Sequence, residues 1–435
     1  MENNKGTRKL SFHKVFNIIS IIFLLTCIIV YGTRFVMLYL ENNKSEKTKM
    51  IGDIIKDNNN GNKNFKNIKG DYYFNGSDVN NYLKYSNFMW RIIKVDKKGS
   101  VTIVLDNNVT SLSRGSSNFK DSSIYNWLNK DDEDTGFFEN VLNDTPKYLD
   151  YTNSCIDDID DTNKITCKKT LSKTYVSIPS LNDYVNTGSS KSFMNLGNYY
   201  LLNKGSKNVW CVDENGKIST SDGNDIIGIK PEVTIKKTTK LVSGNGSKDE
   251  PYIFEEDVPS QLGSIVKIGD DLWQVYDING DNYRLALTSY LKVNGKEITN
   301  KYSKSGFAFN VNEYGSLANY LNVRYLNSLN YKNILEEFDL ANGAYVNNDY
   351  KEVLKTKVKV KVGILSVGDM ILNQGVNEYF MASGNENMVY VFESGSKIGT
   401  KQPSNMLNVI PTISVKKDKI IEYGTMDAPY EVKYE

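Results

Sequence analysis

Histidine is almost absent from this 435-residue chain, whose one histidine is His13, close to the N-terminus. Catalytic centres in which histidine activates a serine or cysteine, and zinc sites that depend on imidazole, are therefore excluded from the rest of the sequence. Charge of one sign is lacking as well, because 53 lysines and arginines nearly balance 52 aspartates and glutamates, for a net charge of +1. That balance does not indicate a nucleic-acid-binding protein. Carboxylates and a serine–lysine pair are the catalytic chemistry that remains.

Cysteine is scarce, with four residues. Cys155 and Cys167 flank an acidic loop, and a disulfide between them would close about a dozen residues and stabilise the fold by about 3 kcal/mol. Two free thiols are the alternative, and the sequence leaves both states open. Cys211 follows Trp210 in an expected strand, so we expect a buried small side chain rather than a nucleophile.

The longest apolar run lies near the N-terminus. Residues 15–33 contain no charged side chain, and a helix of that length reaches across the hydrocarbon layer of a bilayer. A cleaved signal peptide has a shorter apolar segment and a small-residue cleavage site, and a pilin-type N-terminus would carry an acidic residue at the start of its helix. We therefore expect an uncleaved transmembrane signal anchor over residues 15–40. The basic residues before it place residues 1–14 in the cytoplasm and the C-terminal domains outside the cell, as in a single-pass protein of the cell membrane.

The segment after the apolar run has a different composition. Residues 41–69 are rich in asparagine, lysine and glycine, with the breaker-like run Asn58-Asn59-Asn60-Gly61-Asn62. Such a segment cannot bury enough apolar surface to fold alone, so we expect a tether. Met50, Ile51, Ile54 and Ile55 could form one short helical patch inside it.

The remainder of the chain repeats itself. Trp90-Arg91-Ile92-Ile93 is echoed by Trp273-Gln274-Val275-Tyr276, and Asn126-Trp127-Leu128-Asn129 by Asn319-Tyr320-Leu321-Asn322. Residues 199–237 align without a gap with residues 379–417. Landmarks that return in one order indicate a tandem duplication. We therefore expect a first repeat domain over residues 70–257 and a second, divergent one over residues 260–435.

Each copy shows the same succession of patterns. Apolar stretches around turn sequences predict hairpins at 88–105 and 272–287. Apolar residues spaced by three and four positions then predict two short helices per copy. These helices are expected near 124–128, 138–142, 317–321 and 331–335. Because the last third of each copy is again strand-like, the sequence predicts an α+β fold with two compact antiparallel-sheet domains that carry short helices.

Few residues indicate a chemical site. Acidic clusters at 131–134, 157–161 and 255–257 fall between expected elements, where solvated loop acids are the ordinary outcome. Asp277, Asn279 and Asp281 have the spacing of a calcium-loop fragment, but they coincide with a hairpin turn. We therefore expect neither a metal nor another cofactor.

Aromatic residues supply the only candidates for ligand contact. The four tryptophans lie on apolar stripes, which is typical of core residues. Loop tyrosines are better placed to touch a ligand, and the candidates are Tyr199, Tyr200 and Tyr379.

Four motifs of the first copy resemble an uncharacterised tandem domain of surface proteins from low-GC Gram-positive bacteria, Firmicutes and Mollicutes-like. The motifs are Phe88-x-Trp90-Arg91-Ile92-Ile93, Ser122 with Trp127-Leu128-Asn129, Gly228-Ile229-Lys230-Pro231, and Gly244-x-Gly246 with Pro251-Tyr252. In layout such domains are distantly similar to the formylglycine-generating-enzyme and C-type-lectin-like group, which implies compact α+β modules. The arginine before the family's proline is Lys230 here and Ile410 in the second copy, and the cysteine pair of the oxidase members has no equivalent. The resemblance therefore implies no catalysis.

These observations favour a membrane-anchored extracellular protein whose two modules bind a cell-envelope glycan or a surface protein without enzymatic activity. Duplicated modules on one tether gain avidity through a raised effective concentration. A carboxylate-dependent cell-wall or polysaccharide-processing enzyme is the alternative, and a third hypothesis makes both copies structural spacers. The partners expected are thus the membrane, through residues 15–40, and a glycan or protein of the cell surface.

Overall fold

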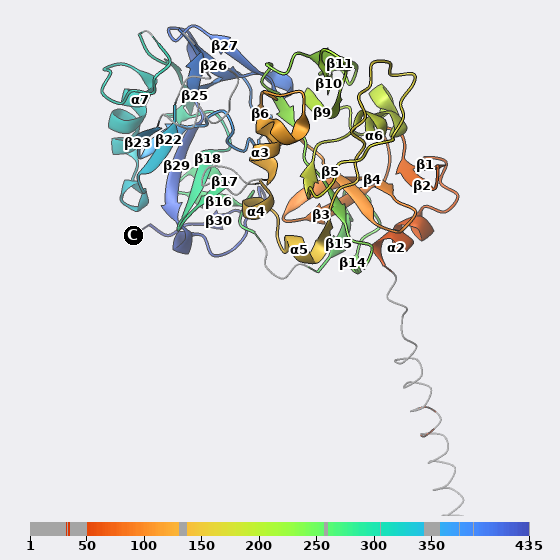
Figure 1. The fold of residues 1–435 in the computed structure, drawn as a ribbon. Coiled ribbons are helices and arrows are strands. Elements are labelled where there is room, and N and C mark those ends of the chain that lie inside the picture. The colour runs from red at the N-terminus through yellow and green to blue at the C-terminus, as the bar shows by residue number, and fades with distance from the viewer. Residues whose placement is uncertain are drawn as a thin grey trace, which may run out of the picture. The chain divides into compact units, whose positions relative to one another are not determined.

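The computed structural model describes residues 50–129, 137–255, 260–304, 306–342, 357–373, 375–385 and 387–434, together with Gly32 and Arg34. Residues 50–435 form one compact unit and residues 1–49 a separate one. The compact unit contains both repeats, and strands dominate it (Figure 1).

The first repeat contains two sheets. The larger is built from β1 (Phe65–Ile68), β2 (Asp71–Phe74), β3 (Tyr82–Tyr85), β4 (Phe88–Val95), β5 (Val101–Leu105), β7 (Leu149–Asp150), β8 (Val176–Ser177), β13 (Glu232–Ile235), β14 (Leu241–Ser243) and β15 (Tyr252–Phe254). Its order is β14-β15-β3-β4-β5-β13-β7, with β8 beside β13 and the β1–β2 hairpin attached to β4. The smaller sheet, in the order β11-β10-β9-β12-β6, consists of β6 (Thr110–Leu112), β9 (Tyr199–Lys204), β10 (Val209–Val212), β11 (Ile218–Ser221) and β12 (Ile227–Ile229).

The second repeat is built in the same way. Its larger sheet consists of β16 (Ile265–Ile268), β17 (Asp271–Asn279), β18 (Asn282–Leu287), β24 (Val362–Ile364), β29 (Pro411–Lys416) and β30 (Tyr430–Glu431), in the order β24-β29-β18-β17-β16-β30. Its smaller sheet consists of β21 (Thr299–Lys301), β25 (Tyr379–Asn385), β26 (Met388–Phe392), β27 (Ile398–Lys401) and β28 (Met406–Asn408), in the order β21-β28-β25-β26-β27. Two hairpins stand apart from these sheets, β19 (Lys292–Val293) with β20 (Lys296–Glu297) and β22 (Phe338–Ala341) with β23 (Lys357–Val360).

Helices are short in both repeats. The first repeat holds α2 (Ile51–Asn58), η1 (Phe119–Asp121), α3 (Ser123–Asn129), α4 (Phe137–Val141), α5 (Thr145–Tyr148), α6 (Leu181–Asn186) and η2 (Ser189–Lys191). The second holds α7 (Leu317–Asn319), η3 (Tyr320–Tyr325), α8 (Leu326–Ser328), η4 (Lys332–Ile334), η5 (Ser394–Ser396) and η6 (Lys417–Lys419). Ser122 and Ser316 cap α3 and α7, because each hydroxyl accepts the backbone N–H three residues later.

The strand pairing is the same in fine detail. In each larger sheet the strand that is last in the chain pairs in parallel with a strand from the start of the repeat. These pairs are β15 with β3 and β30 with β16. A bulge interrupts β4 between Ile92 and Lys94, and another interrupts β17 between Val275 and Asp277. These two bulges stand at equivalent positions of the repeated motif. Lys94 and Asp277 directly follow these bulges, so they are equivalent residues, although their charges are opposite. A bulge changes the direction of the side chains that follow it.

The asparagine that ends each Trp/Tyr-Leu-Asn motif explains why the motif recurs. The Asn129 side chain donates to the carbonyl of Val176 over 2.8 Å and accepts its N–H over 3.1 Å. Asn322 makes the same two bonds to Val362, also at 2.8 and 3.1 Å. Each asparagine thus satisfies a strand residue that would otherwise present unpaired backbone groups. The motif joins a helix to a strand in both repeats.

The prediction of an α+β fold is wrong. Strands hold 35% of the residues and helices 16%, so the chain is mostly β. The predicted helices are present only as single turns or little more, such as α4 with five residues and η4 with three. Apolar residues three and four positions apart indicate that one face of a helix is buried. A single helical turn already gives this spacing, so the spacing does not indicate the length of the helix.

The membrane assignment is also corrected. The signal anchor expected over residues 15–40 and the tail over 1–14 lie outside the described residues, except for Gly32 and Arg34. Among the described residues, no helix is long and apolar enough to cross a membrane. The longest continuous helical segment there, Leu317–Ser328, is shorter at about 1.5 Å per residue than the ~30 Å of bilayer hydrocarbon. The expected single-pass, membrane-anchored protein therefore has no support.

The folded unit begins earlier than expected. Residues 50–69 were assigned to a tether, yet Ile51 and Ile55 of α2 are fully buried. The Ile51 N–H donates to the carbonyl of Thr239 over 2.9 Å, which ties α2 to the end of the first repeat. The apolar pattern from Met50 to Ile55 is therefore the start of the domain, because it packs on a core that lies far along the chain.

The two repeats pack against each other. The segment around Gly368 and the turn around Gly395, both from the second repeat, contact the first repeat through hydrogen bonds. These are Trp127 Nε1 to Gly368 O at 2.9 Å, Thr110 Oγ1 to Asp369 O at 2.8 Å, Ile371 N to Val109 O at 2.8 Å, Ser111 Oγ to Ser396 O at 2.7 Å and Asn198 N to Gly395 O at 3.0 Å. Buried apolar side chains of both repeats belong to one continuous cluster. The two repeats therefore form one compact unit.

Candidate functional site

A polar cleft of about 650 Å³ opens in the first repeat. Four pieces of chain surround it: the β1–β2 hairpin, the turn after β4, the loop between Cys155 and Thr170, and α6. We call it the disulfide cleft. Its lining consists of Ile68, Lys69, Asp71, Tyr73, Lys94, Asp96, Lys97, Lys98, Asn153, Cys155, Thr162, Asn163, Ile165, Cys167, Thr170, Asn182, Val185 and Asn186.

One wall is formed by two neighbouring turns. The β1–β2 hairpin turns through Lys69 and Gly70, both with positive φ, as a two-residue turn of this kind requires. The adjacent turn runs from Asp96 to Gly99, and the Asp96 carboxylate accepts the N–H of Lys98 at 2.8 Å. Asp71 joins the two turns, because its carboxylate accepts the N–H of Lys97 at 3.1 Å. Both carboxylates of the lining thus serve to hold the wall.

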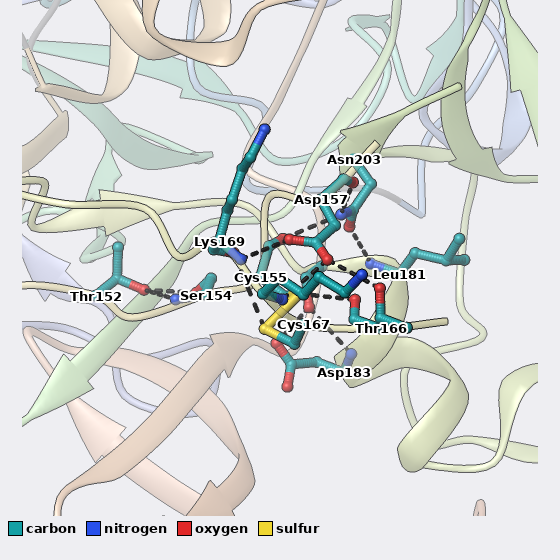
Figure 2. Close-up of a disulfide and its surroundings, with 12 residues drawn as sticks. Thr152, Ser154, Cys155, Asp157, Thr166, Cys167, Lys169, Leu181, Asp183 and Asn203 are labelled. Carbon is teal, nitrogen blue, oxygen red and sulfur yellow. Dashed lines mark hydrogen bonds between the residues drawn. A yellow bond between two sulfur atoms is a disulfide. The ribbon is translucent and has the colours of Figure 1, made fainter. Parts of the chain in front are cut away.

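The opposite wall is the loop closed by the disulfide between Cys155 and Cys167, whose Cα atoms are 5.5 Å apart. This is one of the two states that the sequence left open. Asp157 braces the loop from inside, since its carboxylate accepts the N–H groups of Lys168 at 2.9 Å and Lys169 at 2.6 Å. Figure 2 shows this carboxylate directed at the loop backbone beside the disulfide. A bridge and an internal brace together give the wall a fixed shape.

Asn203 of β9 fastens the same loop to the smaller sheet. Its amide donates to the carbonyls of Cys155 at 3.1 Å and Asp157 at 2.9 Å, and its oxygen accepts the N–H of Leu181 at 2.7 Å. The loop and α6, which lies on the cleft's third side, are therefore positioned by one buried side chain (Figure 2).

The floor of the cleft is a buried ion pair. Lys94 Nζ lies 2.8 Å from Asp183 Oδ1, and the side chains are 7% and 0% exposed. Tyr73 donates its hydroxyl to the same carboxylate oxygen at 3.0 Å. Ser180 donates to the other carboxylate oxygen at 2.6 Å and also caps α6. Asp183 is thus held by a cation and two hydroxyls.

Burial and charge oppose each other at Lys94. Burial is the largest single influence and disfavours the ammonium, but Asp183, Tyr73 and Glu232 together outweigh it, so the pKa of Lys94 is raised. For Tyr73, burial and the nearby Asp183 act together and raise the pKa of the phenol. The lysine is therefore a permanent cation and the tyrosine a permanent donor at ordinary pH.

A second carboxyl lies behind the floor. Glu232 of β13 is fully buried, and one of its oxygens accepts the hydroxyls of Ser177, at 3.0 Å, and Ser154. Its other oxygen has no hydrogen-bond partner among the residues that the structure describes. Burial, reinforced by the charge of Asp183, raises the pKa of Glu232 to about 8. Neither Glu232 nor Asp183 lines the cleft, because Tyr73 and Lys94 do so instead.

The second repeat does not reproduce this site. Among its described residues it has no counterpart of the β1–β2 hairpin. Asp277, the equivalent of Lys94, instead forms an ion pair with Arg284 at 3.6 Å. The position of Glu232, opposite Val104 in β5, is taken by Thr412, opposite Ala286 in β18. The cleft is therefore a property of the first repeat.

Family models, curated proteins and solved structures give no match. The resemblance to bacterial surface domains, based on the motifs around Trp90 and Trp127, accordingly stays a prediction. The C-type-lectin-like layout that it implied gains no support from the mostly β architecture.

The tyrosines predicted to bind a ligand are core residues. Tyr199 and Tyr200 are fully buried and Tyr379 is 1% exposed. The hydroxyl of Tyr199 donates to Met194 O at 2.7 Å, and that of Tyr200 to Asp225 O at 2.8 Å. Tyr379 stacks on Phe392. Consecutive residues of β9 and of β25 are buried, so both faces of these strands are covered, and none of the three tyrosines can offer a ring to a ligand.

The acidic clusters of the sequence do not form a site either. Residues 131–134 lie outside the described residues, as do Glu256 and Asp257. In the loop at 157–161, Asp157 braces the backbone and Asp160 accepts the N–H of Ser206 at 2.6 Å. No group of three or more potential metal ligands occurs in the described part of the chain.

The motif residue Lys230 belongs to a separate buried cluster. Its ammonium donates to Asp106 O at 2.7 Å, and Arg91 pairs with the Asp106 carboxylate at 3.3 Å. Burial, aided by the charge of Arg91, lowers the pKa of Lys230 to about 8. In the second repeat the same positions hold Gln274, Thr288 and Ile410, so the charges are again absent there.

Sequence reasoning missed the floor of the disulfide cleft, although one signal was present. Lys94 stands in the apolar run Phe88–Val95, and the second copy changes its charge. A charged residue in a buried strand needs a partner, which Asp183 supplies from 89 positions away.

Proposed function

We propose that the protein binds a glycan in the disulfide cleft of its first repeat and does not turn it over. The observation that carries the proposal is the composition of the cleft. Thirteen of its eighteen lining residues bear a charged group, a hydroxyl or an amide. Pockets for drug-like ligands have similar volumes but mostly hydrophobic walls. A polar cleft of this size suits a hydrated, polyhydroxylated chain.

Unused hydrogen-bonding groups support a ligand of this kind. The side-chain amides of Asn153 and Asn182 line the cleft and make no hydrogen bond within the described part of the protein. An amide both donates and accepts, as does a sugar hydroxyl, so the two are matched partners. The disulfide, the Asp157 brace and the Lys94–Asp183 pair keep these groups in place, which lowers the entropy lost on binding.

Binding is favoured over catalysis by the state of the carboxyls. Acid–base hydrolysis of a glycan needs two carboxyls that face the bound sugar. Asp71 and Asp96 are engaged by turn N–H groups, while Asp183 and Glu232 are fully buried behind Tyr73 and Lys94. The carboxylate-dependent enzyme is therefore the weaker alternative. Because disulfides persist in oxidising compartments, the ligand is sought among polymers outside the cytosol, with cell-envelope glycans first.

A blocking substitution tests the proposal. Asn182→Trp places a large side chain in the cleft at a half-buried residue of α6, and Asn327→Trp makes the same change on exposed α8 of the second repeat. We expect the full chain and the Asn327→Trp variant to bind cell-envelope glycans on an array, and Asn182→Trp to lose binding at unchanged thermal stability. Equal binding by all three proteins would place the ligand elsewhere. Release of labelled fragments from the glycan would favour the enzymatic alternative.

A further inference from the structure

Resting on that proposed function, we infer that the glycan of the disulfide cleft is anionic and that Lys69, Lys97 and Lys98 receive its acidic groups. These three lysines occupy the two neighbouring turns of one wall, and all three are exposed. None of them makes an ion pair within the described residues. They are the free cations of the lining, since Lys94 is already paired with Asp183.

The acids beside them do not cancel this charge. Apart from Lys94, whose charge Asp183 balances, the lining holds three lysines and two aspartates, which is a formal surplus of 3 − 2 = +1. Both aspartates accept backbone N–H groups of the turns, so their oxygens face the backbone that carries the lysines. Asp71 in particular holds the turn at Lys97 beside the hairpin at Lys69. The wall is therefore built to present ammonium groups close together.

The second repeat shows that the hairpin does not need lysines. Its corresponding turn between β17 and β18 is Asn279-Gly280-Asp281, which contains no cation. Asn-Gly is the favoured sequence for such a turn, whereas Asp96-Lys97-Lys98-Gly99 in the first repeat is longer and basic. Lys69 is unusual as well, because a lysine at φ +55° occupies a position that asparagine adopts more readily. Turn formation alone therefore does not explain these lysines.

The rest of the cleft selects among anions. Lysines alone would accept any polyanion, including an acidic peptide. The free amides of Asn153 and Asn182, set opposite and beside the basic wall, offer both donors and acceptors to hydroxyl groups. A polymer with hydroxyls and regularly spaced carboxylates or phosphates satisfies both sets of groups. The carboxylate and phosphate forms share this chemistry, and the experiment separates them.

The test compares four polymers on the full chain by titration calorimetry: polygalacturonate, its carboxyl-reduced neutral form, a glycerol-phosphate polymer and polyglutamate. Measurements at about 10 mM and about 150 mM salt shorten the screening length from about 30 Å to about 8 Å. We expect one of the two hydroxylated polyanions to bind about tenfold tighter than the neutral glycan at low salt, and the advantage to shrink at high salt. Whichever binds identifies the acidic group.

Charge variants assign the effect to the wall. Lys69→Asn with Lys97→Ser and Lys98→Ser removes three charges, and asparagine is the better residue for the Lys69 conformation, so folding is retained. We expect about tenfold weaker binding of the acidic polymer and a flatter salt dependence. Lys292→Ser with Lys296→Ser removes two exposed charges from the β19–β20 hairpin and is expected to leave binding within about twofold.

The outcomes separate this inference from the proposed function. If the neutral glycan binds as tightly as the acidic ones, the inference is overturned while glycan binding stands. If polyglutamate matches the best polysaccharide, charge alone explains binding and the inference is overturned as well. If no polysaccharide binds and Asn182→Trp changes nothing, the proposed function itself fails.

Discussion

The two repeats share their strand order and differ in what is attached to it. β3, β4, β5, β13 and β15 of the first repeat correspond to β16, β17, β18, β29 and β30 of the second, with the bulge and the parallel pair in the same places. The β1–β2 hairpin, the disulfide and the buried charges around Asp183 occur in the first repeat only, among the described residues. What the repeats share holds the sheet together, and what the first repeat adds makes the cleft.

This difference divides the residues into two classes. Asn129 and Asn322 make identical bonds in both copies, so they maintain the fold. Ser180 and Asp183 also have counterparts, Ser366 and Asp369, and Ser366 N–H donates to Asp369 Oδ2 at 2.7 Å. In the first repeat this aspartate pairs with Lys94 at 2.8 Å, whereas the residue equivalent to Lys94 in the second repeat is Asp277. The turn that contains this aspartate is thus common to both repeats. In the first repeat it lies beneath the cleft, because its aspartate pairs with Lys94.

The sharpest test replaces the two equivalent aspartates in turn. Asp183→Asn leaves the Lys94 ammonium buried without its counter-charge, so we expect a loss of about 3–5 kcal/mol in the free energy of unfolding. Asp369 is partly exposed, whereas Asp183 is fully buried, so Asp369→Asn should cost less, at most about 1 kcal/mol. Urea unfolding of both variants and of the exposed control Asp222→Asn measures these differences. Similar losses for Asp183→Asn and Asp369→Asn would show that the repeats use this turn alike.

Reduction of the disulfide gives the next largest effect. Opening the bridge between Cys155 and Cys167 should remove about 3 kcal/mol by the loop-entropy treatment, because twelve positions separate the cysteines. The consequence is local, since the bridge touches only the first repeat. Hydrogen exchange with and without reductant should therefore speed up at residues 155–170 and stay unchanged at 379–417. Equal acceleration in both segments would contradict a bridge that supports the cleft alone.

Much of the sheet could be anticipated from the chain alone. The hairpin at 88–105 corresponds to β4 and β5, and that at 272–287 to β17 and β18, because apolar strands around turn residues carry a strong local signal. Strands of two residues, such as β7 and β8, carry no periodicity and escape notice. The prediction of an α+β fold overestimated the length of the helices. The reason is related, because one helical turn and four turns begin with the same spacing of apolar residues.

The cleft was much less accessible to sequence reasoning. Tyr73 and Lys94 at its floor contact Asp183 behind them, and Glu232 is buried further back, so the partners come from distant segments that only the fold brings together. Tyr199, Tyr200 and Tyr379 were chosen as exposed loop aromatics, yet their strands turn them into the core. A better signal was the contrast between copies: Lys94 against Asp277 marks a position where burial and charge conflict in only one repeat.

Glu232 adds a dependence on pH that the second repeat lacks at the same position. Its pKa is about 8 when folded and about 4.3 when unfolded, so the folded state binds the proton more tightly between these values. Stability from this group is therefore complete below about pH 4 and is lost as the pH rises towards 8. Between about pH 5 and 7, this group should lower the unfolding free energy of the unmodified protein by about 2–3 kcal/mol. We expect this part of the decline to be absent in Glu232→Gln.

The matched variant for this test is Thr412→Val, at the equivalent position of β29, which introduces no titrating group. Urea unfolding at several pH values should give the same slope for Thr412→Val and the unmodified protein. Lys94, which faces Glu232, has a raised pKa and remains charged throughout this window, so the slope reports Glu232. A slope that survives in Glu232→Gln would assign the pH dependence to another residue.

The smallest expected effect concerns the feature that the repeats share most closely. Asn129→Ala and Asn322→Ala each remove two hydrogen bonds to a strand residue and leave its N–H and C=O unpaired, so each should cost about 1–2 kcal/mol. Asn327→Ala is the control, because its exposed amide bonds to Val323 O of its own helical segment and to the ammonium of Lys332, and to no strand. Urea unfolding should give equal losses for the first two variants within about 0.5 kcal/mol and little change for the third. Unequal losses would mean that one repeat no longer depends on the joint between helix and strand, and the common framework on which the cleft is built would then be weaker in that copy.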